Sequence, residues 1–233
     1  MSEITAVILC GGRGERLRPF TEHLPKALVP LNGRPILHHL MAYLTHSGVK
    51  RFVLCTGYKA ECIEQFVRDQ CDPEWDVRCV NSGDATMTQR MRDAWPHVRE
   101  QALVCYGDTL ANVNVSGLQR RHRKSGALAT ISLYRPHNPF GVIKFDRQRR
   151  VRSFAEKPRM SQWVNIGFIL CETPAILEFL QPACDMVEFL DALTEAGKLF
   201  AYEHSGKHIT INTEKERQQA ENEVVEFLSV LDT

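Results

Sequence analysis

A glycine-rich, cationic stretch near the N-terminus, CGGRGERLRPFTEHLPKAL, holds the residue types that most clearly suggest chemistry. The apolar run over residues 5–10 leads into it and predicts a buried strand. The groups that follow this strand are three glycines, an arginine and a lysine: Gly11, Gly12, Gly14, Arg16 and Lys26. Glycines let a backbone approach a phosphate closely, and backbone N–H groups in such a turn bind anions. The stretch therefore predicts a phosphate-facing turn with positive charge beside it.

Two well-known phosphate motifs do not fit this stretch. A Walker loop needs Gly-Lys-Ser/Thr, which is absent. A dinucleotide fingerprint needs a third glycine where Leu17 stands, which disfavours an NAD-linked dehydrogenase. A plain strand-to-helix turn with solvent-facing arginines stays open on the residues alone.

Two later stretches place charged groups directly after strand-like runs. In VCYGDTL, Asp108 follows an apolar strand, where it can bind Mg²⁺ together with substrate phosphates or serve as a turn or N-cap aspartate. In SFAEKP, Glu156 can accept hydrogen bonds from sugar hydroxyls and Lys157 can hold a phosphate. Taken alone, this dipeptide more often forms a surface charge pair before a proline turn.

Two polar stretches could complete a site. The stretch NSGDATMTQRM, over residues 81–91, leads into a helix and offers donors and acceptors for a base edge. The stretch HITINTEKE, over 208–216, alternates like a strand and reaches Asn212, which can be a helix N-cap or a metal ligand through its carbonyl oxygen. Thr213 and Glu216 have the spacing of a capping box.

Short apolar runs alternate with amphipathic segments along the chain. The predicted strands cover residues 5–10, 51–56, 75–80, 102–106, 127–134, 140–145, 164–171 and 199–203. The predicted helices cover 35–46, 59–69, 88–95, 116–125, 173–180, 187–196 and 213–231. Strand and helix alternate in the first half, as in parallel sheets covered on both faces, and the second half is richer in strands. We therefore expect a three-layer, Rossmann-like α/β/α sandwich with a mixed, mainly parallel central sheet, formed by residues 1–233 as a single domain.

The composition excludes several classes of protein. The 233 residues carry 29 basic and 28 acidic side chains, which argues against binding nucleic acid through bulk charge. The basic runs at 119–124 and 147–152 are expected to be solvated helix and turn faces. No apolar run approaches the roughly 20 residues of a membrane span, and the N-terminus does not have the pattern of a signal peptide. The eight cysteines stand mostly in or beside strand-like runs, so we expect free thiols and a reduced, cytoplasmic protein.

Taken together, these stretches resemble the sugar-1-phosphate nucleotidyltransferases, or nucleoside-diphosphate-sugar pyrophosphorylases. GGRGERLRP…PKAL matches the family signature closely, and the GD strand end, EKP and VNIGF follow in the family's order over nearly the whole chain. SGDATMTQRM and SFAEKP are most similar to the cytidylyltransferase branch that acts on glucose 1-phosphate. The resemblance implies the nucleotide-diphospho-sugar transferase fold, without the C-terminal β-helix that some relatives carry.

The resemblance also implies a reaction and a set of roles. The reaction transfers a nucleotidyl group from an NTP, CTP in this branch, to a sugar 1-phosphate, with release of pyrophosphate and with Mg²⁺ as cofactor. The implied catalytic residues are Arg16, Lys26 and Asp108. The implied nucleotide contacts are Leu9, Gly11, Gly12, Gly14, Arg16, Lys26, Gly83, Thr88 and Gly107, the sugar-phosphate contacts are Gly141, Glu156, Lys157 and Asn165, and the metal ligands are Asp108 and Asn212. Relatives assemble in several ways, so a homo-oligomer is compatible with the family.

The chain departs from the family pattern at several positions. Cys10 replaces the usual alanine, and Ile166 stands where the branch often has glycine. Gln89 replaces a glycine of the branch, which indicates an altered base pocket and leaves open another NTP or a heptose phosphate. Asn212 replaces the second metal aspartate, which should weaken metal binding and leaves open a catalytically silent, nucleotide-binding regulatory subunit. Trp163 could cover a sugar ring or take a core or rim position.

Overall fold

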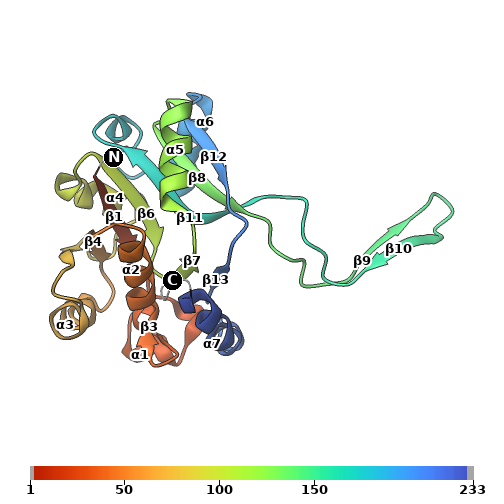
Figure 1. The fold of residues 1–233 in the computed structure, drawn as a ribbon, viewed down its shortest axis with the longest axis horizontal. Coiled ribbons are helices and arrows are strands. Elements are labelled where there is room, and N and C mark those ends of the chain that lie inside the picture. The colour runs from red at the N-terminus through yellow and green to blue at the C-terminus, as the bar shows by residue number, and fades with distance from the viewer. Residues whose placement is uncertain (1–2, 230–233) are drawn as a thin grey trace.

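The computed structural model describes residues 3–229 and centres on one seven-stranded sheet (Figure 1). Its strands are β1 (Ile4–Leu9), β4 (Arg51–Thr56), β5 (Asp76–Asn81), β6 (Gln101–Tyr106), β8 (Ala129–Tyr134), β11 (Val164–Glu172) and β12 (Leu199–Glu203). From edge to edge their order is β12-β8-β11-β6-β1-β4-β5. Strand β11 runs antiparallel to β6 and β8, and the other neighbouring pairs are parallel. The predicted mixed, mainly parallel sheet is thus confirmed.

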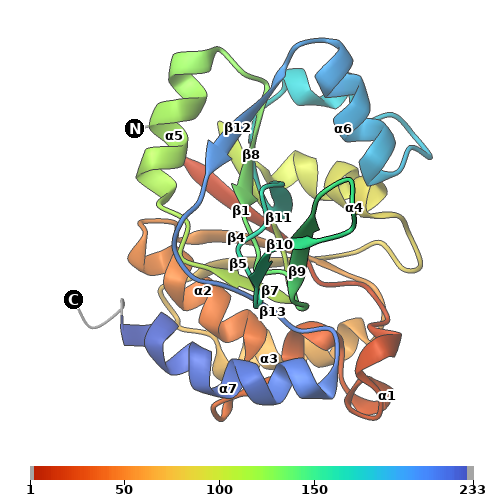
Figure 2. The same cartoon turned by 90° about the vertical axis from the view of Figure 1, so that its right-hand side faces the viewer.

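Helices cover both faces of this sheet (Figure 2). The helices are α2 (Ile36–His46), α3 (Ala60–Gln70), α4 (Met87–Ala94), α5 (Val115–Ser125), α6 (Met186–Glu195) and α7 (Glu214–Leu228). Side chains along β1 alternate between two apolar cores, because successive residues of a strand point to opposite faces. Ala6 and Ile8 join one core with α2, α3, α5 and α7, whereas Val7 joins the other with α4 and α6. The predicted three-layer sandwich is therefore present.

Several short elements connect these layers. They are the helical turns η1 (Glu15–Leu17), α1 (Phe20–His23), η2 (Lys26–Leu28), η3 (Trp95–His97) and η4 (Ala175–Glu178), and the strands β2 (Pro30–Leu31), β3 (Arg34–Pro35), β7 (Thr109–Ala111) and β13 (His208–Thr210). Strand β2 pairs with β3, and β7 pairs with β13. The pairing of β7 with β13 carries the chain from the last strands of the sheet to the end of β6, which brings the start of α7 close to that edge.

Most predicted elements are present, with ends that differ by one or two residues. The helix predicted over 173–180 is wrong, because the segment begins with Thr173-Pro174 and contains only the single 3₁₀ turn η4. No helix within residues 3–229 is long and apolar enough to cross a membrane.

The start of α7 settles two interpretations of the sequence. The predicted capping box is confirmed, because Thr213 and Glu216 satisfy each other's backbone N–H groups. Thr213 is therefore the N-cap, and the N-cap interpretation of Asn212 is wrong. The last residues of the helix predicted over 213–231 lie outside the described residues.

A long ribbon projects from one side of the molecule (Figure 1). We call residues 135–163 the arm and the other described residues the body. The arm contains a hairpin of β9 (Val142–Phe145) and β10 (Val151–Ala155). Its stalk is also paired, because the N–H of Asn138 donates to the carbonyl of Pro158 and the N–H of Met160 donates to that of Pro136, both at 2.8 Å. The basic segment 147–152 is exposed, as predicted, but only its first part is a turn, because Val151 and Arg152 belong to β10.

Candidate functional site

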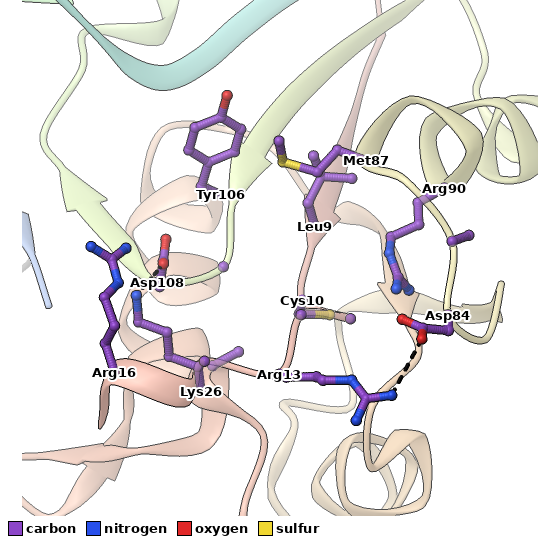
Figure 3. A pocket seen from close by; sticks show the side chains of 16 residues that line it. Leu9, Cys10, Arg13, Arg16, Lys26, Asp84, Met87, Arg90, Tyr106 and Asp108 are labelled. Carbon is purple, nitrogen blue, oxygen red and sulfur yellow. Dashed lines mark hydrogen bonds and ion pairs between the residues drawn. The ribbon is translucent and has the colours of Figure 1, made fainter. Parts of the chain in front are cut away.

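A cavity of about 380 Å³ opens where β1 and β6 end (Figure 3). This is the usual location of ligands in α/β sheets, beyond the carboxyl ends of the strands. Its walls are the turn after β1, the turn after β6 and the segment that leads into α4. Eight predicted site residues line it: Leu9, Gly11, Gly12, Gly14, Arg16, Lys26, Gly107 and Asp108.

Local hydrogen bonds hold the glycine-rich turn after β1. Gly14 has a φ of 60°, and its carbonyl accepts from the N–H of Leu17 at 2.9 Å and the hydroxyl of Thr21 at 3.1 Å. A Cβ atom on Gly14 would lie 2.9 Å from the Cβ of Lys26, so glycine lets the turn pack against that lysine. A Cβ on Gly12 would meet no atom within 4 Å. Gly12 is thus a position where a ligand can approach the backbone closely.

Lys26 lies at the centre of a polar network that joins both turns (Figure 3). Its Nζ is 2.5 Å from Oδ2 of Asp108 and 3.1 Å from Oδ1 of Asn212. The same Oδ1 accepts from Nη2 of Arg16 at 3.1 Å. One amide oxygen therefore accepts from two cations, and one carboxylate neutralises the lysine. Four predicted residues that are far apart in the sequence meet at one end of the cavity.

Arg90 is a cavity residue that the sequence analysis missed. It extends from α4, is only 4% exposed, and donates to the carbonyls of Thr56 and Gly83. Cβ atoms on Gly11 and Gly57 would lie 1.9 and 2.3 Å from its Nη1, so these two glycines form a slot for the guanidinium. Arg90 also lines the cavity, so its guanidinium adds fixed positive charge and hydrogen-bond donors to that wall. The sequence does carry a signal for this slot, because a glycine follows each of two neighbouring strands: Gly11 follows β1 and Gly57 follows β4.

The predicted base-recognition loop is only partly exposed to the cavity. Thr88 is buried, and its hydroxyl donates to the carbonyl of Cys184. Gly83 lies behind the wall, where it supplies a carbonyl to the buried arginine. The loop residues that line the cavity instead are Asp84, Ala85 and Met87. Asp84 pairs with Arg13 at 3.2 Å, which links this loop to the glycine-rich turn (Figure 3).

Tyr106 forms the wall between the cavity and β11. Burial raises the pKa of its phenol, so the ring is neutral and apolar toward a ligand. Asn165 donates to the phenol oxygen at 3.5 Å, and its own carbonyl accepts from the N–H of Gly167 at 2.8 Å. A Cβ on Gly167 would lie 2.3 Å from the Tyr106 ring. Asn165 thus reaches the rim of the cavity through the tyrosine and does not line it.

The other predicted sugar-phosphate contacts lie on the arm. A Cβ on Gly141 would be 3.0 Å from Oε2 of Glu156, so these two residues are neighbours there. Gly141, Glu156 and Lys157 are absent from the cavity lining, and the hairpin stands clear of the body in Figure 1. Trp163, at the base of the arm, stacks with Arg135 and does not line the cavity either. The structure thus separates residues that the sequence analysis assigned to one site.

The buried histidines and cysteines of the described residues do not form a metal centre. Burial lowers the pKa of His204, and burial with the neighbouring His204 lowers that of His208 to about 4. Burial raises the pKa of the Cys10 thiol, which disfavours a nucleophilic thiolate beside the cavity. Among residues 3–229, no three His, Cys, Asp or Glu side chains gather as a metal cluster. All eight cysteines lie in the described part and are free thiols, as expected.

Comparisons with known proteins agree with this geometry. A family model described as nucleotidyl transferase matches residues 5–205. The glucose-1-phosphate cytidylyltransferase of Salmonella typhimurium is 31% identical over 228 residues, which cover 86% of this chain and 88% of that protein. The D-glycero-alpha-D-manno-heptose 1-phosphate guanylyltransferase of Campylobacter jejuni is 28% identical over 187 residues, 79% of this chain and 84% of that protein.

A solved structure has the same fold. HddC from Yersinia pseudotuberculosis superposes with a TM-score of 0.73 at 23% identity, and the match covers 96% of this chain and 100% of that chain. The predicted family and fold class are therefore both confirmed. The chain belongs to the nucleotidyl transferase family and is a sugar-1-phosphate nucleotidyltransferase.

Proposed function

We propose that the protein transfers the cytidylyl group of CTP to a sugar 1-phosphate, glucose 1-phosphate or a close relative, with Mg²⁺ as cofactor. The observation that carries this proposal is the network in which Lys26 contacts Asp108 and Asn212 at the floor of the cavity. It places a cation, a carboxylate and an amide oxygen beside a turn whose backbone can bind phosphates. That combination suits two anionic substrates.

Chemical complementarity at Arg90 supports cytosine as the base. A guanidinium donates hydrogen bonds and accepts none. The O2 and N3 atoms of cytosine form an edge with two neighbouring acceptors, whereas uracil and thymine carry an N3–H donor there. Guanine also offers two acceptors, O6 and N7. Arg90 therefore favours CTP and GTP over UTP and dTTP, and the similarity to cytidylyltransferases favours CTP.

The proposed reaction needs no general base. The second pKa of a phosphate monoester is about 6, so a sugar 1-phosphate is already dianionic near pH 7. One of its oxygens attacks the α-phosphorus of the NTP, and pyrophosphate leaves in line. Lys26 would neutralise charge at the reacting phosphates, and Arg16 would hold the departing pyrophosphate. Catalysis would come from positioning and from fixed positive charge.

The residues around Lys26 fit a magnesium ion. Oxygens of Asp108 and Asn212 both contact the same Nζ atom, so they surround one small region of the cavity. Mg²⁺ prefers oxygen ligands and is commonly held by one or two carboxylates together with substrate phosphates. Asp108 and Asn212 would hold the ion, and its chemistry would be to offset phosphate charge. One carboxylate instead of two is expected to make this binding weak.

The decisive experiment is pyrophosphate release measured with Mg²⁺ across four NTPs and several sugar 1-phosphates. We expect the fastest turnover with CTP, and the best partner would identify the sugar. Chelation of Mg²⁺ should abolish turnover, and added Mg²⁺ should restore it. Faster turnover with GTP would contradict the assignment of the base and would favour a relative of the heptose-phosphate enzymes.

A catalytically silent regulatory subunit is the alternative that Asn212 leaves open. The cavity argues against it, because a subunit that only binds nucleotide has no need of all the catalytic residues. Five of them line the cavity together: Gly11, Gly12, Arg16, Lys26 and Asp108. Nucleotide binding without pyrophosphate release for any substrate pair would favour the regulatory alternative.

A further inference from the structure

Helix α4 and the loop before it carry the groups that would select the base. Asp84, Ala85 and Met87 line the cavity at or before the start of this helix, and Arg90 lines it from the next turn (Figure 3). Hydrogen bonds weaken steeply when donor and acceptor are misaligned, so these groups can select a base only while they keep a fixed direction. The way in which α4 is held therefore decides how well this wall of the cavity discriminates between bases.

The side of α4 that faces away from Arg90 is tied to the turn before α6. Thr88 is buried, and its hydroxyl donates to the carbonyl of Cys184. Arg92 shares that side of the helix, because it lies four residues further on, and its guanidinium donates to the carbonyl of Leu180 at 2.5 Å. Arg90 lies two residues from each of them, which is about 200° around the helix. Two hydrogen bonds to that turn therefore set the rotation of α4 that aims Arg90 at the cavity.

The hydroxyl of Thr88 also orders the start of the helix. A carbonyl only accepts, so the single hydroxyl proton of Thr88 points to Cys184. The hydroxyl of Thr86 lies 3.0 Å from that of Thr88 and must then donate to it. The Thr86 oxygen in turn accepts from the N–H of Gln89 at 3.1 Å and caps the helix. One chain of hydroxyl groups thus links the turn before α6 to the N-cap of α4, beside the residues that line the cavity.

The turn that accepts these hydrogen bonds is a fixed support. Leu180 is completely buried, and it belongs to the same apolar core as Met91 of α4. Ala183 has a φ of 64°, a left-handed conformation that is strained for a residue with a Cβ atom. Such a conformation persists only where the surrounding structure determines it. The carbonyl of Cys184, the next residue, is therefore held in place to accept from Thr88.

We propose that Thr88 is a positioning residue for base selection: through the Cys184 carbonyl it fixes the rotation of α4, and the protein loses discrimination between NTPs when this hydrogen bond is removed. Arg92 supports the same rotation through Leu180. Thr88 itself does not line the cavity and is only 2% exposed, so it acts through α4. This inference rests on the proposed function, in which Arg90 selects the base, and it names the residue on which that selection depends.

Calorimetric titration with CTP, GTP, UTP and dTTP in turn provides the test. Thr88→Val keeps the shape of the side chain but cannot donate, so the NTP that wild type binds most tightly should bind about tenfold more weakly. The NTP that binds most weakly gains least from Arg90 and should change little, so the range of the four affinities should narrow. Thr88→Ser keeps the donor and should restore the wild-type range. An unchanged range in Thr88→Val would overturn the proposal.

A merely structural role for Thr88 predicts a different pattern. Ile169→Val removes a buried methylene from the same core and should lower the melting temperature without touching either hydrogen bond of α4. Thr194→Val removes a hydroxyl that donates to the Leu190 carbonyl within α6. We expect both controls to keep the wild-type range of affinities. If Ile169→Val narrows this range as much as Thr88→Val does, discrimination follows stability, and the positioning role is overturned.

A double-mutant cycle identifies the group that Thr88 positions. In the Arg90→Ala protein the group that α4 aims is absent, so adding Thr88→Val should cost little further NTP affinity. The full loss in that background would overturn the proposal. Arg92→Met removes the second hydrogen bond and should narrow the range of affinities in the same direction. If Thr88→Val does not fold, Arg92→Met carries the test alone, and an unchanged range there overturns the proposal.

Pyrophosphate release separates this inference from the proposed function. Selective NTP binding without pyrophosphate release would contradict the proposed function, whereas the affinities of the Thr88 variants would still decide the role of Thr88. The same comparison holds if wild type prefers an NTP other than CTP, because the variants are judged on the NTP that it binds most tightly. A wild-type protein that binds all four NTPs equally well would overturn the inference, since Thr88 would then have no discrimination to maintain.

Discussion

The cavity at the ends of β1 and β6 and the arm differ in how their positions are determined. The turns around the cavity rest on two buried cores, and Leu17 and Ala27 within them are almost completely buried. Most residues between 139 and 157 are exposed, and the apolar side chains of the arm have few neighbours within their own chain. The packing of the body can therefore fix its part of the site, whereas the packing within the hairpin is too sparse to fix the position of the arm.

The largest effect should come from the centre of the preorganised part. Lys26→Ala removes the cation that contacts both Asp108 and Asn212, and we expect turnover to fall by about 100-fold or more. The melting temperature should change little, because Lys26 points into the cavity. The control is Lys50→Ala, which removes an exposed lysine paired with Glu74. Activity of Lys26→Ala within tenfold of wild type, with intact folding, would defeat the role given to this lysine.

Two adjacent glycines of the cavity should respond differently. Gly11→Ala forces a methyl group onto the buried guanidinium of Arg90, so the free energy of unfolding should fall by about 2 kcal/mol. Gly12→Ala meets no atom, so it should cost less than about 0.5 kcal/mol yet weaken NTP binding by blocking the backbone. Chemical denaturation and NTP titration of both variants make the comparison.

A second substitution checks the cause assigned to Gly11. Arg90→Ala empties the slot, so Gly11→Ala should destabilise the Arg90→Ala protein far less than it destabilises wild type. If Gly11→Ala lowers the free energy of unfolding equally in wild type and in Arg90→Ala, the guanidinium is not the group that the added methyl meets.

The sequence predicted the parts of the site whose signal is local. The apolar run before Gly11 and the Thr213–Glu216 spacing each specify their own element, and both predictions agree with the structure. Arg90 was missed because its slot is made by glycines on two other strands, and no local pattern records that contact. The strands β2, β3 and β7 were missed because they are too short to show alternation, whereas β13 lies in the stretch HITINTEKE, whose alternation was recognised. Strand β10 was missed because arginines dominate the residues before and at its start, and because the register shift between Val151 and Ser153 breaks the alternation of apolar residues.

The arm should affect one substrate and not the other. Lys157→Ala is expected to raise KM for the sugar 1-phosphate about tenfold, the scale of one lost charge-assisted hydrogen bond, and to leave KM for the NTP unchanged. Lys144→Ala on the same hairpin is the matched control, because Lys144 is likewise an exposed lysine and has no assigned role in the site. A parallel rise in both KM values would place Lys157 in the nucleotide part of the site, and no change in either would remove it from the site.

The smallest effect should come from the junction between the two regions. The His208 ring lies 5.0 Å from that of Tyr134, the last residue before the arm, and Arg159 of the arm covers the same tyrosine. Burial lowers the pKa of His208 to about 4, against an ordinary value of 6.5. As the pH falls below 6.5, the unfolded chain takes up a proton that the folded chain refuses until pH 4. His208 therefore makes stability fall with falling pH, by roughly 1 kcal/mol between pH 7 and pH 5.5.

Replacing this histidine isolates its share of the pH dependence. His208→Phe keeps a ring against Tyr134 but cannot be protonated, so unfolding free energies measured between pH 7 and pH 5.5 should show a shallower slope than in wild type. Replacing His208 also removes its coupling to His204, so the difference reports this pair, whereas the buried histidines elsewhere contribute equally to both proteins and cancel. The same slope in both proteins would mean that His208 is solvated in solution. The root of the arm would then be open to solvent like the hairpin, and the closely packed part of the molecule would end at β8.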